Sequence, residues 1–177
     1  MRLVGSEMCI RDRARSHGAE VVRRPEHLAG DTASSESALL HALEQLSTAG
    51  PLPPRLVFLQ CTSPFTSGEQ IDQVLAALDA PTVNSSFAVA PWHGFLWRGD
   101  GRGINHDPQQ PRQRRQDLEP AYLETGAIYA MDMSAFRAVG SRFCPPWQPV
   151  VLEHPGPEID TPADLAICRA LAQAAPR

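Results

Sequence analysis

The sequence predicts an α/β fold with a mostly parallel sheet, and three observations carry this prediction. Residues 56–59 are four consecutive apolar residues between turn formers, a pattern typical of a strand buried on both faces. An amphipathic helix follows at 67–78, and a second apolar strand comes after it at 86–90. Strand, helix and strand in this order favour parallel strands joined by right-handed crossovers.

Composition bounds the class of protein. A chain of 177 residues with 42% apolar and 20% charged residues is typical of one globular domain. The net charge of -4 gives no reason to expect nucleic acid as a partner. The four cysteines show no C-x-x-C spacing, which suits a reduced cytoplasmic setting better than disulfides or zinc. Since no apolar run approaches the ~20 residues of a membrane helix, we expect a soluble cytoplasmic protein.

The amino terminus looks unlike the rest of the domain. Residues 1–13 show neither helical nor strand periodicity, and they are similar to a translated sequencing-adapter artefact. Residues 14–22 are typical of the end of a helix, a cap at Gly18 and a short strand at Val21 and Val22, which is the middle of a βαβ unit. We therefore expect 1–13 to be non-native and 14–177 to form a domain that lacks its first βαβ unit.

A polar loop at 23–36 leads into a helix with leucines at helical spacing. The exposed N–H groups at the start of this helix, with serines and Arg24 nearby, suit an anion or the polar edge of a nucleotide. An ordinary N-cap, at Asp31 or Thr32, explains the same pattern.

The strand at 56–59 ends at Gln60, followed by Thr62 and Ser63. In parallel sheets ligands bind just beyond the carboxyl ends of the strands, so these polar residues are expected at a site. The alternative is a strand that simply runs into a proline turn. The next helix begins at a capping box formed by Ser67 and Gln70.

Residues 91–120 interrupt the alternation of strands and helices. They combine aromatic residues, a glycine-rich turn and three arginines within 112–115, and a hairpin, lid or arm is expected there. The arginines could bind phosphate or carboxylate, or they could belong to a solvated loop.

Two further strands are expected, at 122–131 and 149–152. Gly126 indicates a close backbone approach in the first of them. Beyond the second, Glu158 and Asp160 lie two apart in an extended segment, so both can point into one site that suits Mg²⁺ or Mn²⁺. The alternative is that Asp160 only helps to end a strand. Thr161 caps a final helix, whose residues expected to face the core are Leu165, Cys168 and Leu171.

Five motifs, in this order, resemble those of the acylneuraminate cytidylyltransferases, the CMP-sialic acid synthetases. They occupy residues 24–35, 59–64, 114–117, 124–129 and 158–162. The resemblance implies a Rossmann-like nucleotidyltransferase that joins CTP to a nine-carbon 2-keto acid sugar, giving a CMP-sugar and pyrophosphate with Mg²⁺. It also implies that 91–120 is an arm exchanged between the subunits of a homodimer.

The same resemblance implies roles for individual residues. Those implied for the cytidine part are Arg24, Ala33 and Ser35. Those implied for the acyl sugar are Gln60, Arg115, Tyr122 and Thr125. The catalytic pair implied to hold the metal is Glu158 and Asp160.

Two family motifs have no match here: a glycine-rich, basic loop of the kind I-P-A-R-G-G-S-K that holds the triphosphate, and a strand ending V-S-T-D. We therefore expect this chain to bind CTP poorly and to be inactive. The alternatives are a non-catalytic nucleotide-sugar binding or assembly module and a metal-dependent glycosyltransferase. The sequence does not distinguish N-acetylneuraminate, its deaminated relative, legionaminate and pseudaminate as the sugar.

Overall fold

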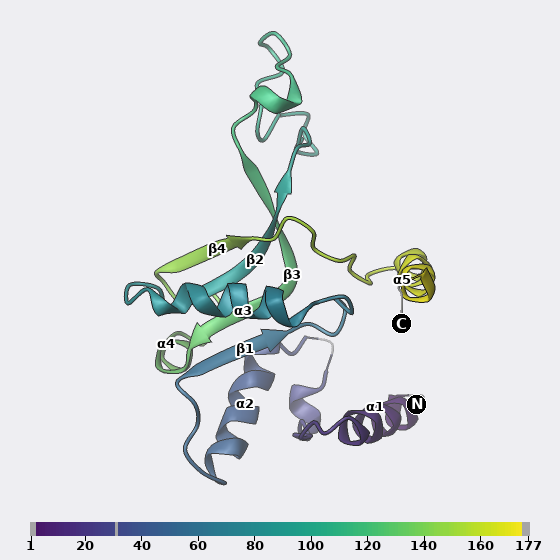
Figure 1. The fold of residues 1–177 in the computed structure, drawn as a ribbon, viewed down its shortest axis with the longest axis vertical. Helices are drawn as coiled ribbons and strands as arrows, with labels where there is room; N and C mark the ends of the chain where they lie inside the picture. Colours follow the sequence, from purple (N-terminus) through teal and green to yellow (C-terminus); the bar gives the residue numbers. More distant parts are fainter. Residues whose placement is uncertain (1–2, 31, 175–177) are drawn as a thin grey trace. The chain divides into compact units, whose positions relative to one another are not determined.

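A computed structural model describes residues 3–30 and 32–174. The chain divides into two compact units, one up to Pro53 and one from Pro54 onward. Figure 1 shows the elements of both units.

The first unit is helical. Its elements are α1 (Leu3–Ser16), the short 3-10 helix η1 (Glu26–Leu28) and α2 (Ser35–Ser47). Residues 3–13, whose sequence shows no helical periodicity, nevertheless belong to α1. The cap at Gly18 is confirmed by its φ of 79°. Whether residues 1–13 are native stays a prediction from the sequence.

The strand expected at Val21 and Val22 is absent from the described part of this unit, where residues 19–25 form no regular structure. A strand is stable only when a neighbouring strand hydrogen-bonds its backbone N–H and C=O groups, whereas a helix pairs these groups within itself.

The cap of α2 also differs from the expectation. Ser34, and not Thr32, has the extended backbone of an N-cap and accepts a hydrogen bond from the Ser37 N–H at 3.1 Å. Asp31 lies outside the described residues.

The second unit is built on a four-stranded mixed sheet. The strands are β1 (Arg55–Leu59), β2 (Ser85–Trp92), β3 (Ala121–Asp132) and β4 (Trp147–Val151), in the order β1-β3-β2-β4. β2 and β4 are parallel, while β3 is antiparallel to both β1 and β2. The predicted α/β class is confirmed, and three of the four strands run in one direction. The sequence did not predict β3 between them. It runs backwards because the chain returns from the arm directly beside β2.

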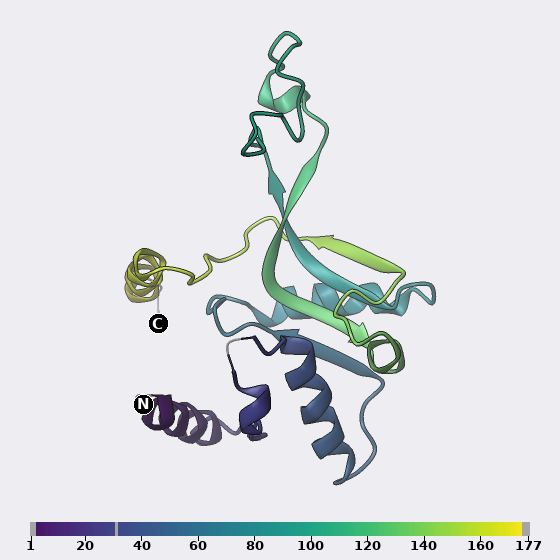
Figure 2. The same ribbon diagram turned by 180° about the vertical axis from the view of Figure 1, so that it is seen from behind.

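Helix α3 (Gly68–Ala76) covers one face of this sheet and continues into the 3-10 helix η2 (Ala77–Asp79). The reverse view in Figure 2 shows α3 behind the strands. The predicted capping box of Ser67 and Gln70 is confirmed. Val74 and Leu78 pack with strand residues in the core, the buried members of which are Ala88, Ala127, Ile128, Ala130 and Leu152. The short helix α4 (Met133–Val139) follows β3 and ends at Gly140, whose φ is 69°.

A bulge interrupts β3 opposite Ala88. On β2 two residue steps separate Phe87 from Val89, whereas their partners on β3, Tyr129 and Glu124, are five steps apart, so β3 carries three extra residues. Gly126 lies within the bulge and has a φ of 68°. The bulge therefore changes which β3 side chains share a face of the sheet.

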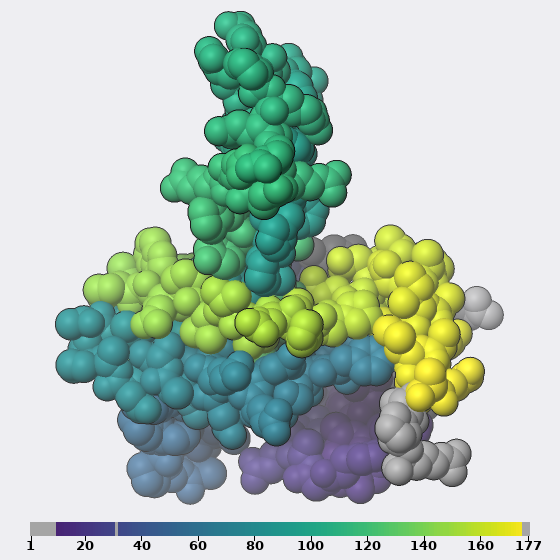
Figure 3. All heavy atoms as spheres, turned by 45° about the horizontal axis from the view of Figure 1, so that its top comes forward, coloured from purple at the N-terminus to yellow at the C-terminus, as the bar shows by residue number. Residues whose placement is uncertain are grey.

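Residues 93–120, here called the arm, connect β2 to β3 and project away from the sheet. Figure 3 shows the arm, in teal and green, standing clear of the strands that carry it. A small hairpin closes through the Ile104 N–H, which donates to the Leu96 carbonyl at 2.8 Å. The only other regular element in the arm is the 3-10 helix η3 (Arg115–Asp117). The predicted interruption of the alternating pattern is confirmed.

The last element is α5 (Pro162–Ala174). Its predicted capping box is confirmed, since Asp164 N–H donates to the Thr161 hydroxyl at 3.2 Å and Thr161 N–H donates to the Asp164 carboxylate at 2.8 Å. Cys168 is buried as expected. Leu171 is 46% exposed, so the prediction that it faces the core is wrong. One stripe of the helix remains uncovered.

Among the described residues, no helix is both long and apolar enough to cross a membrane.

Candidate functional site

The segment that carries Glu158 and Asp160 is joined to the end of β1 by the backbone. The Ile159 N–H donates to the Thr62 carbonyl at 2.8 Å, and the Gln60 N–H donates to the Ala127 carbonyl at 3.1 Å. The segment that carries the two acidic residues therefore lies at the carboxyl end of the first strand of the sheet.

The side chains of Gln60 and Glu158 both lie against Gly126. A Cβ atom built on Gly126 would lie 2.5 Å from Glu158 Oε1 and 3.4 Å from Gln60 Nε2, so both side chains approach the same point of the β3 backbone. The hydroxyl of buried Ser63 donates to Glu158 Oε1 at 3.2 Å. We call Gln60, Glu158 and Asp160, with their neighbours Ser63 and Gly126, the acidic site.

Gly126 is required here for two separate reasons. Its φ of 68° lies in the left-handed region that other residues seldom adopt, and a side chain would occupy the space of the Glu158 carboxylate. The sequence-based expectation of a close backbone approach at this glycine is confirmed.

The charges of the acidic site are incompletely neutralised. Burial raises the pKa of Glu158 above its ordinary value, and the negative charges of Asp160 and Glu124 raise it further. The hydrogen bond from Ser63 acts in the opposite direction, because it favours the ionised carboxylate. Asp160 is thus close enough for its charge to affect Glu158, although its own side chain is exposed.

Sequence reasoning missed two residues beside this site, Glu124 and Tyr129. The Tyr129 hydroxyl donates a short hydrogen bond to Glu124 Oε1. Burial, followed by the hydrogen bond and charge of Glu124, raises the pKa of Tyr129 to about 12. Both residues lie in the motif at 124–129, and Gly126 is the one sequence signal for a bulge, but its size, which brings residues five apart into contact, is not predictable from the sequence.

The donor set of the acidic site fits a small divalent cation. Carboxylate oxygens are the hard ligands that Mg²⁺ and Mn²⁺ prefer, and a cation would relieve the repulsion that raises the pKa of Glu158. Within the described ranges, no group of three or more His, Cys, Asp or Glu side chains is arranged to hold a metal. Glu158 and Asp160 would therefore supply two ligands, and phosphate and water would supply the others.

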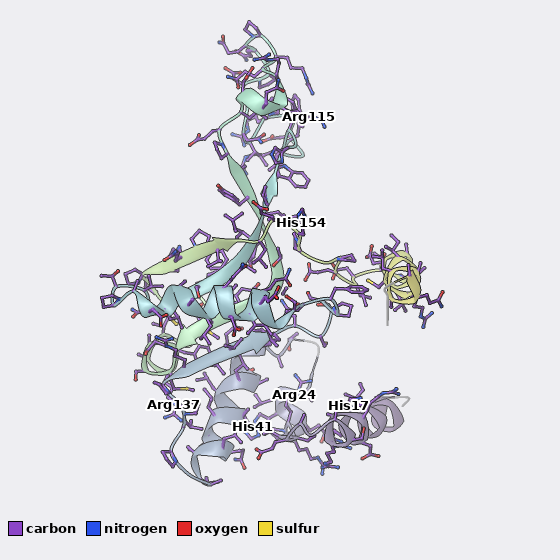
Figure 4. The ribbon with its side chains drawn as sticks, viewed as in Figure 1. His17, Arg24, His41, Arg115, Arg137 and His154 are labelled. Atoms are coloured by element: carbon purple, nitrogen blue, oxygen red, sulfur yellow. The ribbon has the colours of Figure 1, made fainter. Side chains whose placement is uncertain are left out.

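Two of the residues expected to bind sugar lie elsewhere, at the base of the arm. Arg115 and Tyr122 line one cavity of about 380 Å³, together with Trp92 and His93. Figure 4 shows Arg115 on the arm and His154, which precedes the acidic segment, below it. The structure thus brings Arg115 and Tyr122 together in a cavity whose lining does not include Gln60.

Thr125 is used inside the sheet. The side chain is only 9% exposed, and its hydroxyl donates to the Ala88 carbonyl at 3.2 Å, opposite the bulge. A contact between Thr125 and a sugar stays a prediction that this burial does not favour.

The residues expected to bind the nucleotide belong to the first unit. Arg24 is exposed and precedes η1, while Ala33 closes a turn by donating its N–H to the Gly30 carbonyl at 3.0 Å. Ser35 is the first residue of α2. The exposed start of this helix remains a suitable place for an anion, and nucleotide binding there stays a prediction.

No protein-family model matches the sequence. Solved structures match the fold. One is 4-diphosphocytidyl-2C-methyl-D-erythritol synthase from Anaerococcus prevotii, with a TM-score of 0.64 and 15% identity over 96% of this chain and 78% of that chain. Another is CMP:2-keto-3-deoxy-manno-octonic acid synthetase complexed with CTP, with a TM-score of 0.64 and 14% identity over 94% of this chain and 78% of that chain. The chain therefore has the nucleotidyltransferase-like α/β fold seen in these enzymes.

Proposed function

We propose that the chain is a cytidylyltransferase of the acylneuraminate type, which transfers CMP from CTP to a nine-carbon 2-keto acid sugar and releases pyrophosphate. The observation that carries the proposal is the position of the Glu158 carboxylate beside Gln60, across Gly126, at the carboxyl end of β1. The fold likeness supports it, because both similar structures are named for cytidyl chemistry and one was determined with CTP.

In the proposed reaction the anomeric hydroxyl oxygen of the sugar forms a bond to the α-phosphorus of CTP. The bond from that phosphorus to the bridging oxygen breaks, pyrophosphate leaves, and the hydroxyl proton passes to solvent. Glu158 and Asp160 hold Mg²⁺ or Mn²⁺, which when bound neutralises phosphate charge. Ser63 orients Glu158, and the Gln60 amide is placed to hydrogen-bond the acyl sugar.

The cavity at the arm base is assigned to the acidic end of the sugar. Arg115 offers a guanidinium for a carboxylate, and Tyr122 offers an aromatic face and a hydroxyl. Arg24, Ala33 and Ser35 are assigned to the cytidine part on the motif alone. A cytoplasmic location, where CTP is available, belongs to the same proposal.

A homodimer formed through the arm is also proposed. The arm exposes large apolar side chains, with Trp97 at 50% and Ile104 at 53% exposed. Exposed apolar surface of this kind is typical of a protein interface. A second copy of the chain is the proposed occupant, since the family that the motifs resemble exchanges this segment between subunits.

Binding of the reaction product tests whether the chain has the proposed nucleotide site. The chain is titrated with CMP-N-acetylneuraminate by calorimetry, with and without Mg²⁺. We expect binding that requires the metal and is lost in the Glu158→Gln and Asp160→Asn variants. Binding that is unchanged without the metal, or no binding at all, would contradict the proposal.

Turnover assays address the alternatives. Pyrophosphate release is measured with CTP and each of the four candidate sugars, with 2-keto-3-deoxy-manno-octonic acid as the comparison substrate. Because the triphosphate-loop motif has no match in the sequence, little or no turnover is expected, and measurable CMP-sugar would refute that expectation. Product binding without turnover suits the binding-module alternative equally, whereas glycosyl transfer from a preformed nucleotide sugar would favour a glycosyltransferase.

A further inference from the structure

The buried tyrosine beside the acidic site has no part in the reaction described above. Tyr129 is 2% exposed, yet its hydroxyl donates to Glu124, a residue that is itself exposed. A buried hydroxyl that reaches an exposed carboxylate fixes a side chain that would otherwise move freely in solvent.

The bulge makes this contact possible. On a regular strand, residues five apart lie on opposite faces and about 17 Å apart. The three extra residues in β3 place Glu124 and Tyr129 on one face, because their partners Val89 and Phe87 are two apart on β2. The same bulge exposes the Gly126 backbone to the Glu158 carboxylate. The bulge in β3 therefore affects the position of the Glu124 carboxylate and that of the Glu158 carboxylate.

The Tyr129 ring is held firmly from several sides. It stacks on Phe58 with ring centroids 5.9 Å apart and meets the edge of Phe143 at 6.0 Å. The guanidinium of Arg142 lies 4.7 Å from the ring centroid. The hydroxyl therefore cannot swing away from Glu124 without disrupting the packing of these rings.

We propose that Tyr129 is a positioning residue of the acidic site: its hydroxyl donates a hydrogen bond that holds the Glu124 carboxylate on the stretch of β3 that also carries Gly126, against which Glu158 lies, and the charge of Glu124 there strengthens cation binding by Glu158 and Asp160. Glu124 acts here as an outer charge and not as a direct ligand, in keeping with the absence of a three-residue metal group among the described residues. The inference rests on the proposed function only in taking Glu158 and Asp160 as cation ligands.

Mn²⁺ binding to the whole chain, followed by electron paramagnetic resonance of the free ion, tests the proposal. We expect Tyr129→Phe to weaken Mn²⁺ binding roughly 3- to 10-fold, less than the about 10- to 100-fold typical of a group that hydrogen-bonds a metal ligand directly, because Tyr129 acts through Glu124. Glu124→Gln should weaken it at least as much. The double variant should be no weaker than Glu124→Gln alone, because Tyr129 acts through Glu124.

Two controls separate positioning from packing and from general charge. Phe58→Leu removes one ring contact and keeps the hydroxyl; because Phe143 and Arg142 still hold the Tyr129 ring, it should leave Mn²⁺ affinity within about twofold if the hydrogen bond is what matters. Asp79→Asn removes a carboxylate that pairs with Arg55 at the opposite end of β1, and it should have no effect. Thermal unfolding of every variant verifies that it is folded.

The outcomes are distinguishable. Unchanged Mn²⁺ affinity in Tyr129→Phe, or losses that add in the double variant, would overturn the positioning role and leave the metal pair intact. Failure of the unmodified chain to bind Mn²⁺ would instead overturn the metal pair, and the positioning role with it.

Discussion

The acidic site and the arm belong to the same unit but are built in different ways. At the acidic site, buried Ser63, the Gly126 backbone and the Ile159 N–H all restrict where Glu158 can lie. The arm is held mainly by short-range turns, and it leaves Trp97 and Ile104 exposed. The acidic site can therefore be tested within one chain, whereas the arm is expected to acquire its final environment from a second copy.

The largest expected effect comes from Gly126→Ala. The added methyl group collides with the Glu158 carboxylate, so we expect Mn²⁺ affinity to fall by at least about 10-fold. The left-handed backbone adds a loss of about 1–2 kcal/mol in the free energy of unfolding, measured with urea.

Gly140→Ala is the matched control, since its φ of 69° is nearly the same and nothing lies within 4 Å of the added atom. It should show the backbone cost and keep Mn²⁺ binding. Equal Mn²⁺ losses in the two variants would show that the contact with Glu158 is unimportant.

The second prediction concerns the arm. Ile104→Glu places a charge on the proposed interface, and we expect the dimer dissociation constant to rise roughly 10-fold or more because a carboxylate is costly to bury. Sedimentation across a range of concentrations measures this. Val139→Glu, at a 51% exposed apolar position on α4, is the control and should leave the oligomeric state unchanged. A chain that is monomeric at every concentration would remove the dimer proposal.

The third prediction distinguishes a structural Thr125 from a sugar-binding one. Thr125→Val removes the donor to the Ala88 carbonyl, and we expect the free energy of unfolding to fall by about 1–2 kcal/mol, with Mn²⁺ binding retained. Thr125→Ser keeps the hydroxyl and should lose less. If Thr125→Val instead weakened binding of the CMP-sugar while stability held, the sugar-pocket role would be favoured.

The smallest effect is on stability at Glu158. Because burial first, and then the charges of Asp160 and Glu124, raise its pKa, the folded protein binds this proton more tightly than the unfolded chain. The wild type therefore loses stability as the pH rises from about 4.5 through the raised pKa. Glu158→Gln lacks this loss and should gain less than about 1 kcal/mol at pH 7, while cation binding disappears.

Thermal unfolding of both proteins between pH 4.5 and pH 8 measures the difference. A wild type that becomes more stable relative to Glu158→Gln as the pH rises would contradict the sign.

The contrast between the regions also explains what sequence could predict. The capping boxes at Ser67 and Thr161 and the close approach at Gly126 were predictable, because each depends on neighbours in the chain or on one residue's own conformational limits. The position of β3 between β1 and β2 was not, since strand order depends on contacts between distant segments. Thr125 was assigned to the sugar because no sequence signal shows that its hydroxyl is needed by the Ala88 carbonyl.

The three extra residues in β3 have a further consequence for how this protein can vary. Inward and outward positions alternate along a strand, and an odd insertion reverses the phase, so that residues after Gly126 follow the opposite parity from residues before it. A deletion of one residue between 125 and 128 would exchange the two buried faces of the second half of the strand, so that Ile128 and Ala130 would leave the core that packs against Val74 of α3. Length in this short stretch should therefore be more strictly constrained than the identity of most of its side chains.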